Sequence, residues 1–304
     1  IFQNRDQYEG YNIYSMKKYV DKKRIIFTTI IVILIIITLG FIIYYSVDTT
    51  IRLKNAKRFE QKLIEYESKQ EELQKQERER QAKIPKLTDE GKKNIKGIYK
   101  SETKRVFLTF DDGPSVNTAD VLDILKSNDI KATFFVLGTQ VEKMPEMVKR
   151  AYQEGHYIAN HGYSHQYSQI YSSPETVLQE FNQCNSAVAK AIDVPEYNSH
   201  LFRFPGGSVG GKYANLKAEA VTLLEKNNIM HVDWNALTGD AEKSSPDEEY
   251  LMNNLQKTTQ NKNSIVILMH DAQAKRVTVE FLPKLIEFFQ QQGYQFENFY
   301  SIIK

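Results

Sequence analysis

The hydrophobic and polar positions of this 304-residue chain divide it into segments of different character. Residues 25–47 are almost wholly apolar and carry no charge. About 20 such residues, each rising about 1.5 Å in a helix, cross a hydrocarbon core of about 30 Å. We therefore expect a transmembrane helix over Ile25 to Val47. A cleaved signal peptide is the alternative, but the apolar segment is longer than a usual signal sequence and no small-x-small cleavage pattern follows it.

Lysine and arginine are concentrated directly before this apolar segment, whereas Asp48 follows it. The asymmetry predicts a cytoplasmic basic N-terminus over residues 1–24 and an extracytoplasmic location for the rest of the chain beyond the helix. Met16 begins a compact basic region, so we also expect Ile1 to Ser15 to precede the true translation start. The predicted location is the cell membrane, which the chain crosses once.

Residues 48–84 are dense in Lys, Glu, Gln and Arg, and their apolar residues recur at a spacing of three to four. This pattern predicts a helical stalk. Two stalks could pair weakly into a coiled-coil dimer, and a solvated single helix is the alternative. Pro85, Gly91 and Gly97 then predict a linker over residues 85–102.

The remaining residues, 103–304, show short apolar segments that alternate with amphipathic ones. Buried strands are expected at Val106 to Phe110, Ala132 to Leu137, His156 to Asn160, His200 to Phe204, Met230 to Trp234 and Ser264 to Met269. Helices are expected at Val116 to Ser127, Pro145 to Glu154, Pro174 to Ile192, Asn215 to Asn227, Asp247 to Asn261 and Thr278 to Gln292. This alternation predicts a mostly parallel sheet covered by helices, either open or closed into a barrel.

Composition narrows the function only slightly. The formal net charge of +2 provides no single-sign field of the kind that attracts nucleic acid, so no nucleic-acid partner is expected. The one cysteine, Cys184, cannot form an internal disulfide, and its amphipathic surroundings favour a buried apolar role over a nucleophilic one.

Polar residues follow the predicted strands. They are Asp111, Asp112, His161, His165, Arg203, Asp233, Asp240, His270 and Asp271. Because the C-terminal ends of parallel strands share one face of an α/β fold, we expect these side chains to converge there.

Two histidines and an aspartate in this set form a candidate metal site. His161 and His165 stand four residues apart and would project from one face if their segment begins a helical turn. Two histidines with one aspartate leave a position open for water on a zinc-like ion. The adjacent Asp111 and Asp112 cannot point the same way, so one can bind metal while the other takes a proton from water. A turn or helix-cap role for this pair is the alternative.

Five short motifs, in this order, resemble those of the NodB-like polysaccharide deacetylases, carbohydrate esterase family 4. They are Thr109-Phe-Asp-Asp-Gly-Pro114, His161-x3-His165, Arg203-Phe-Pro205, the region from Asp233 to Asp240, and Leu268-Met-His270. The resemblance implies that residues 103–304 form a catalytic domain, a distorted (β/α) barrel of seven or eight strands. With its anchor and external domain, the chain looks most like the peptidoglycan N-acetylglucosamine deacetylases.

The resemblance also implies a division of roles. The residues concerned are Asp111 as general base, Asp112, His161 and His165 as metal ligands, and His270 as the general acid that protonates the leaving amine. Nitrogen and oxygen ligands favour zinc, with cobalt or manganese as alternatives.

Around this centre the resemblance implies supporting roles for further residues. They are Arg203, which would brace Asp111; Pro205 and Gly206, at the substrate, where the Gly206 N–H would hold the oxyanion; Asp240, which would orient His270; and Leu268, which would line the pocket for the acetyl methyl group. For Arg203 and Asp240 the alternative is a structural ion pair.

This chain departs from the family pattern at two points. Ala241 follows Asp240 where family members commonly have tryptophan, so Trp234 is a candidate for the missing wall of the groove and Asp233 for the functional acid. In the third motif Gly206 follows the proline where an aromatic residue is common, which would leave that side of the sugar cleft more open.

The predicted function is hydrolysis of the acetamide on N-acetylhexosamine units of a cell-wall polysaccharide. The outward topology favours peptidoglycan as the partner. Deacetylation of an exported polysaccharide or of O-acetyl esters is an alternative, and so is a non-catalytic wall-binding protein. Asp111 and His270 beside the candidate ligands argue against the last, because binding alone needs no acid–base pair.

Overall fold

The computed structural model describes residues 5–303, with side chains described from Met16 onward. The chain divides into two compact units between Glu77 and Arg78. The expectation that Ile1 to Ser15 precede the translation start concerns residues outside those whose side chains are described.

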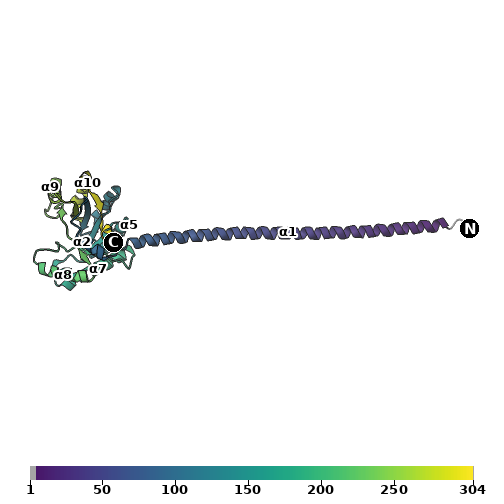
Figure 1. Cartoon of the computed structure of the whole chain (residues 1–304), viewed down its shortest axis with the longest axis horizontal. Coiled ribbons are helices and arrows are strands. Elements are labelled where there is room, and N and C mark those ends of the chain that lie inside the picture. Colours follow the sequence, from purple (N-terminus) through teal and green to yellow (C-terminus); the bar gives the residue numbers. More distant parts are fainter. Residues whose placement is uncertain (1–4, 304) are drawn as a thin grey trace. The chain divides into compact units, whose positions relative to one another are not determined.

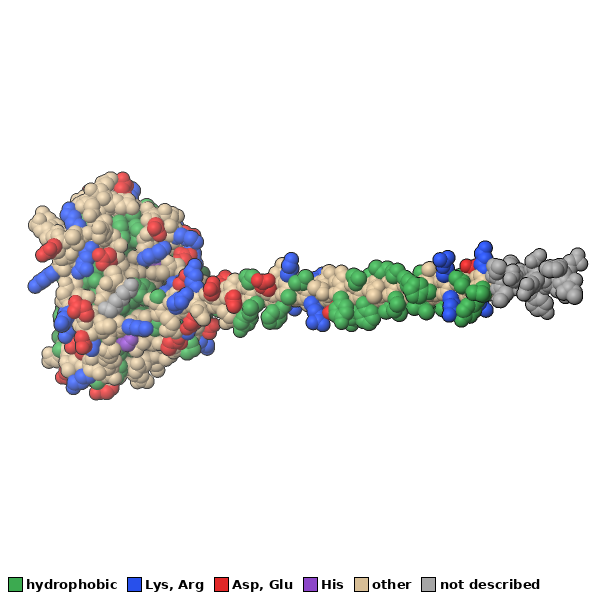
Figure 2. Space-filling view, turned by 45° about the vertical axis from the view of Figure 1, so that its right-hand side comes forward, with side chains coloured by type: hydrophobic (Ala, Val, Ile, Leu, Met, Phe, Trp, Pro, Cys, Tyr) green, Lys and Arg blue, Asp and Glu red, His purple; other side chains and the backbone are tan. Residues whose placement is uncertain are grey.

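The N-terminal unit is formed by helix α1, Arg5–Ala82, as far as Glu77 (Figure 1). The residues of α1 from Arg78 onward belong to the C-terminal unit. Its apolar segment is long enough to cross a membrane, and none of the side chains in that segment is buried. Figure 2 shows this band of hydrophobic side chains. The hydroxyl groups of Thr28 and Thr29 donate hydrogen bonds to backbone carbonyls one turn earlier in the helix. Polar groups in an apolar environment need such internal partners. Residues 48–82, where a helical stalk was expected, belong to α1 as well.

The C-terminal unit is built on a parallel sheet. Its strands are β1 (Arg105–Asp111), β2 (Thr133–Val136), β3 (Tyr157–Asn160), β4 (Leu201–Phe202), β5 (Met230–His231), β6 (Ala236–Leu237), β7 (Ser264–His270) and β8 (Gln295–Glu297). The strand order is β5-β4-β3-β2-β1-β7-β6, and β8 pairs with the start of β1.

This sheet is curled. Strands β5 and β6 lie at opposite ends of the strand order, yet only residues 232–235 separate them in the sequence. The Val232 N–H donates to the Phe202 carbonyl on one edge, and the Asn235 N–H donates to the Val266 carbonyl on the other. Four residues can connect the two edges only if the edges approach each other. The predicted distorted barrel is therefore confirmed, as a curled parallel half-barrel.

Helices pack around the strands (Figure 1). They are α2 (Asp89–Lys96), α3 (Val116–Ser127), α4 (Gly138–Lys143), α5 (Pro145–Gln153), α6 (Tyr167–Ile170), α7 (Pro174–Ile192), α8 (Ala214–Lys226), α9 (Glu248–Thr259) and α10 (Arg276–Gln291). The amphipathic segments identified in the sequence form α3, α5, α7, α8, α9 and α10, each within about two residues of the expected bounds.

The segment expected as a linker, residues 85–102, is instead packed against the barrel. It contains α2, and Ile95 and Ile98 are buried in a cluster inside the half-barrel. Gly91 was expected to mark the exit from the stalk into this linker, and a Cβ there would lie 2.7 Å from the Ile303 carbonyl oxygen. This glycine therefore allows close contact between α2 and the C-terminal segment.

Candidate active site

Strands β1 and β7 place a carboxylate and an imidazole side by side. Asp111 ends β1, His270 ends β7, and the two residues are direct partners in the parallel register. The next residue, Asp112, has a φ of +71°, in the left-handed region. This conformation turns the Asp112 side chain away from the direction that strand alternation would give it, so the two adjacent aspartates occupy different places.

Asp112 lies within reach of both histidines of the second motif. Its Oδ1 is 3.5 Å from His161 Nε2 and 3.4 Å from His165 Nε2. Two ligand atoms that each sit about 2.1 Å from a tetrahedral zinc ion are separated by about 3.4 Å, so these spacings fit a shared ion. Asp112 Oδ1 is also buried and has no hydrogen-bond partner among the described residues. An unpaired buried carboxylate oxygen facing two imidazoles is what a cation would satisfy.

The surroundings of His161 leave one ring nitrogen available to a metal. Its Nδ1 lies 2.8 Å from the carbonyl oxygen of Arg203, so Nδ1 carries the proton and Nε2 faces Asp112. Burial lowers the pKa of His161 to about 3 and keeps the ring neutral, the form that binds metals.

The two histidines do not lie on a helical turn, which was the condition under which the sequence placed both imidazoles on one face. They belong to the loop after β3, and α6 begins only at Tyr167. His165 has a φ of +58°, which a helical turn does not contain. The loop still brings the two imidazole centroids within 5.3 Å of each other. The spacing of four residues therefore identified the pair, although a loop and not a helical turn joins the two histidines.

Asp111 is paired with a buried arginine. Arg203 Nη1 donates to Asp111 Oδ1 at 2.8 Å, and both side chains are at most 2% exposed. The other guanidinium donors bond to Thr109 Oγ1 and to the carbonyls of Val232 and Asp233. Burial raises the pKa of Asp111, although the charge of Arg203 opposes the rise. The carboxylate is thus held in one orientation by a donor that cannot lose its proton.

Of the two candidate acids near His270, Asp240 makes the contact. Its Oδ1 is 3.0 Å from His270 Nδ1, and its Oδ2 accepts hydrogen bonds from the His270 N–H and from Thr278 Oγ1. Asp233 instead accepts hydrogen bonds from the backbone and hydroxyl of Ser208. Burial lowers the pKa of His270, but the hydrogen bond and charge of Asp240, followed by the charge of Asp111, outweigh burial and raise it to about 9.

The residues expected at the substrate lie on β7 or in the loops that follow β4 and β5. Gly206 is exposed, with a φ of +73°, and follows Pro205, whose carbonyl accepts a hydrogen bond from Tyr171. Trp234 packs beside the neighbouring glycine, its ring 3.3 Å from where a Gly207 Cβ would lie. Leu268 is half-buried on β7, two residues before His270. Pro205 and Gly206 thus follow β4, Trp234 follows β5, and Leu268 lies on the strand that ends in His270.

Tyr167 is a neighbour of this site that sequence reasoning missed. Its ring centroid is 5.6 Å from that of His165, and its hydroxyl would lie 2.6 Å from a Cβ at Gly206. An aromatic ring therefore stands next to the third motif, where the sequence led us to expect a more open cleft. The only signal in the sequence is its place two residues after His165.

Asp271 is a second residue to which the sequence assigned no role. It is buried, and its Oδ2 accepts a hydrogen bond of 2.5 Å from Thr118 Oγ1 at the start of α3. Burial raises the pKa of Asp271 to about 7. A Cβ at Gly113 would come within 2.4 Å of this carboxylate, so only glycine fits there. Asp271 thus ties the loop after His270 to the loop after Asp112.

Three residues that could hold a metal ion, Asp112, His161 and His165, thus lie beside Asp111 on a curled parallel half-barrel, and comparisons with known proteins identify the family. Residues 99–223 match the family described as polysaccharide deacetylase. The chain is 36% identical over 198 residues to "Putative polysaccharide deacetylase YheN" of Bacillus subtilis, covering 64% of this chain and 66% of that protein. It is 33% identical over 205 residues to a peptidoglycan-N-acetylglucosamine deacetylase of Bacillus cereus, covering 66% and 71%.

Solved structures agree. A carbohydrate esterase from Streptococcus mutans superposes with a TM-score of 0.62 at 29% identity, covering 70% of this chain and 92% of that one. The catalytic domain of peptidoglycan N-acetylglucosamine deacetylase from Eubacterium rectale gives 0.60 at 31% identity, covering 66% and 90%. The chain belongs to the polysaccharide deacetylase family, the NodB-like hydrolases of carbohydrate esterase family 4, as its motifs indicated.

Proposed function

We propose that the chain is a metal-dependent deacetylase that removes N-acetyl groups from N-acetylglucosamine units of peptidoglycan. The observation that carries the proposal is the cluster of Asp112, His161 and His165 at one mouth with Asp111 and His270. Relatives named as peptidoglycan-N-acetylglucosamine deacetylases support the choice of substrate.

Three side chains would hold the ion: Asp112 through Oδ1 and the two histidines through Nε2. When bound, a divalent metal, zinc or alternatively cobalt or manganese, polarises the acetamide carbonyl and lowers the pKa of a bound water. The donor atoms are of the kinds that such an ion accepts, and a water molecule would complete its coordination.

Asp111 would act as the general base. Arg203 fixes the carboxylate through Oδ1 and leaves Oδ2 directed toward the metal ligands, 3.8 Å from His161 Nε2. Because burial raises its pKa, the carboxylate is a stronger base than an ordinary aspartate. It would take the proton from the attacking water.

His270 would act as the general acid. With a pKa of about 9 it is an imidazolium at neutral pH and can donate a proton to the departing nitrogen. Asp240 holds Nδ1 and so directs the other nitrogen, Nε2, away from itself. An amine leaves far more readily when protonated, so an acid that stays charged at neutral pH favours N-deacetylation over ester hydrolysis.

The substrate side would be formed by four positions. The Gly206 N–H would donate to the oxyanion, and Leu268 would contact the acetyl methyl group. Pro205 sets the position of Gly206, and Trp234 would form a wall of the sugar groove. The aromatic ring of Tyr167 lies on the same side as Gly206.

Helix α1 would anchor the enzyme in the cell membrane through Ile25 to Val47, with its basic N-terminus in the cytoplasm. The helical stalk would then carry the hydrolase domain toward the cell wall. A weak dimer through the stalk remains part of this proposal and would be read from the mass of the full chain in detergent.

The test is incubation of the full chain with purified peptidoglycan, measuring free acetate and the glucosamine content of the digested wall. We expect both to rise together, to stop with a chelator, and to be absent in Asp111→Asn. Acetylated xylan is a second substrate, because one relative is a bifunctional xylanase/deacetylase. Release of acetate from xylan but not from peptidoglycan would indicate an O-deacetylase and contradict the proposal. Release of acetate from neither polymer would favour a wall-binding protein.

A further inference from the structure

A buried glutamate on α7 contacts the loop that carries both histidine ligands. Glu180 is 1% exposed. Its Oε2 accepts hydrogen bonds from the backbone N–H groups of Tyr163 at 2.6 Å and Ser164 at 2.7 Å. Its Oε1 accepts a third, from the Ser164 hydroxyl, at 2.6 Å. All three donors belong to residues between His161 and His165.

These bonds are of a strong kind. Two consecutive backbone N–H groups that converge on one oxygen form a concavity for an anion, and here the anion is a side chain of the protein itself. Hydrogen bonds to a charged acceptor are shorter and stronger than neutral ones, which agrees with the three distances. Loss of the carboxylate would leave two backbone donors unsatisfied in the interior, which the fold can relieve only by moving the loop.

The same loop is held from its other side. The Gly162 carbonyl accepts from the Gly138 N–H and the Tyr163 carbonyl from the Thr139 N–H, both at the start of α4. The Gly162 N–H donates to Asn160 Oδ1. The loop is therefore fixed between α4 and α7, and it has to be, because His165 adopts a left-handed conformation that a non-glycine residue keeps only when its surroundings impose it.

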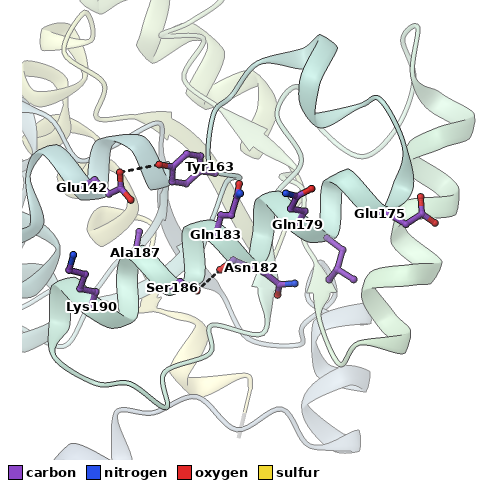
Figure 3. A pocket seen from close by; sticks show the side chains of 10 residues that line it. Glu142, Tyr163, Glu175, Gln179, Asn182, Gln183, Ser186, Ala187 and Lys190 are labelled. Carbon is purple, nitrogen blue, oxygen red and sulfur yellow. Dashed lines mark hydrogen bonds between the residues drawn. The ribbon is translucent and has the colours of Figure 1, made fainter.

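The exposed end of Tyr163 provides a matched control. Its hydroxyl donates to Glu142 at 3.0 Å on the rim of a groove of about 670 Å³ between α4 and α7 (Figure 3). Glu142 is thus a second carboxylate that binds the same loop residue, but it does so in water and at the tip of the side chain. Such exposed contacts contribute little.

We propose that Glu180 is a positioning residue for the metal site, which sets the separation of His161 and His165 through its three hydrogen bonds to the loop between them. The inference rests on the proposed function, because it assumes that these histidines bind a metal. Glu180 itself does not touch the ion. Its removal weakens metal binding in a protein that is otherwise folded.

The experiment measures the affinity of the full chain, in detergent, for Zn²⁺ by competition with a fluorescent chelator. Glu180→Leu removes all three hydrogen bonds and should weaken zinc binding by about 10- to 100-fold, the usual cost of losing a group that orients a ligand. Glu180→Gln should stay within about threefold of wild type, because its amide oxygen can accept both N–H groups while its NH₂ donates to the Ser164 hydroxyl. Glu142→Gln should match wild type.

Unfolding in urea of the metal-free proteins separates positioning from stability. The inference is overturned if Glu180→Leu is less stable but binds zinc as tightly as the wild type. It is also overturned if Glu180→Gln binds zinc as weakly as Glu180→Leu. If Glu180→Leu does not fold, Ser164→Ala removes one of the three bonds, and unchanged zinc affinity in that variant overturns it instead. Wild-type protein that binds no zinc refutes the proposed function and this inference with it, whereas the other outcomes leave the proposed function intact.

Discussion

Replacing Asp240 by asparagine removes the charge that keeps His270 protonated. The pKa of His270 lies at about 9, against 6.5 for an ordinary histidine. At about 1.4 kcal/mol per pH unit, this difference corresponds to roughly 3 kcal/mol in favour of the imidazolium. The hydrogen bond and charge of Asp240 raise the pKa of His270 more than the charge of Asp111 does, and the charge of Asp112 raises it less than either. We therefore expect Asp240→Asn to lower the pKa of His270 by about two units.

The sign of the effect on activity follows from the role of His270 as an acid. The acid works while it is protonated, so activity of the wild type falls as the pH rises through about 9. In Asp240→Asn this fall should begin near pH 7, and at pH 8 the protonated fraction should be about tenfold smaller. The same linkage applies to folding: because the pKa is raised in the folded state, the stability it contributes is present below pH 6.5 and is lost as the pH approaches 9.

The assay is acetate release from peptidoglycan between pH 5 and 10, together with the NMR titration of the His270 ring in the metal-free protein. Thr278→Val is the matched control, because it removes a hydrogen bond of 2.7 Å to Asp240 Oδ2 but leaves the charge in place. The reasoning would be refuted if the activity of Asp240→Asn fell at the same alkaline pH as that of the wild type and the pKa of His270 measured by NMR were unchanged.

Three further predictions concern stability, each measured by urea unfolding. Arg203→Met leaves Asp111 buried without its partner and should cost about 3–5 kcal/mol at pH 7, so a cost below about 1 kcal/mol would contradict the buried pair. Gly206→Ala should destabilise more than Gly210→Ala, because both glycines have a φ of +73° but only the first has a neighbour, Tyr167, within reach; equal costs would refute that contact. Ile98→Ala should lower the free energy of unfolding by about 2–5 kcal/mol, because Ile98 is buried. An unchanged stability would contradict the packing of residues 85–102 against the barrel.

The regular elements of the barrel could be predicted from the sequence because their patterns are local. Strands β1 and β7 are mostly apolar, and α7 has Ser173 as its N-cap and an apolar face. Strands β6 and β8 were missed because they are two and three residues long and depend on pairing with β7 and β1. The choice between Asp233 and Asp240 could not be made for a similar reason, since it depends on how the half-barrel closes.

The metal cluster was predictable as a set of residues but not as a geometry. Spacing identified His161 and His165, yet their common direction depends on a loop held by contacts that are distant in sequence. Glu180 illustrates the difficulty, because a glutamate in an amphipathic helix usually faces water. It is buried here only because the loop after β3 folds onto α7, and no local pattern reports that contact.

Anomalous X-ray diffraction at the zinc edge, from crystals of the full chain grown with zinc, tests the central claim most directly. We predict one ion about 2.0–2.2 Å from Asp112 Oδ1 and from Nε2 of His161 and His165, with Asp111 and His270 beside it. Zinc bound elsewhere, with these three side chains left without an ion between them, would contradict the claim.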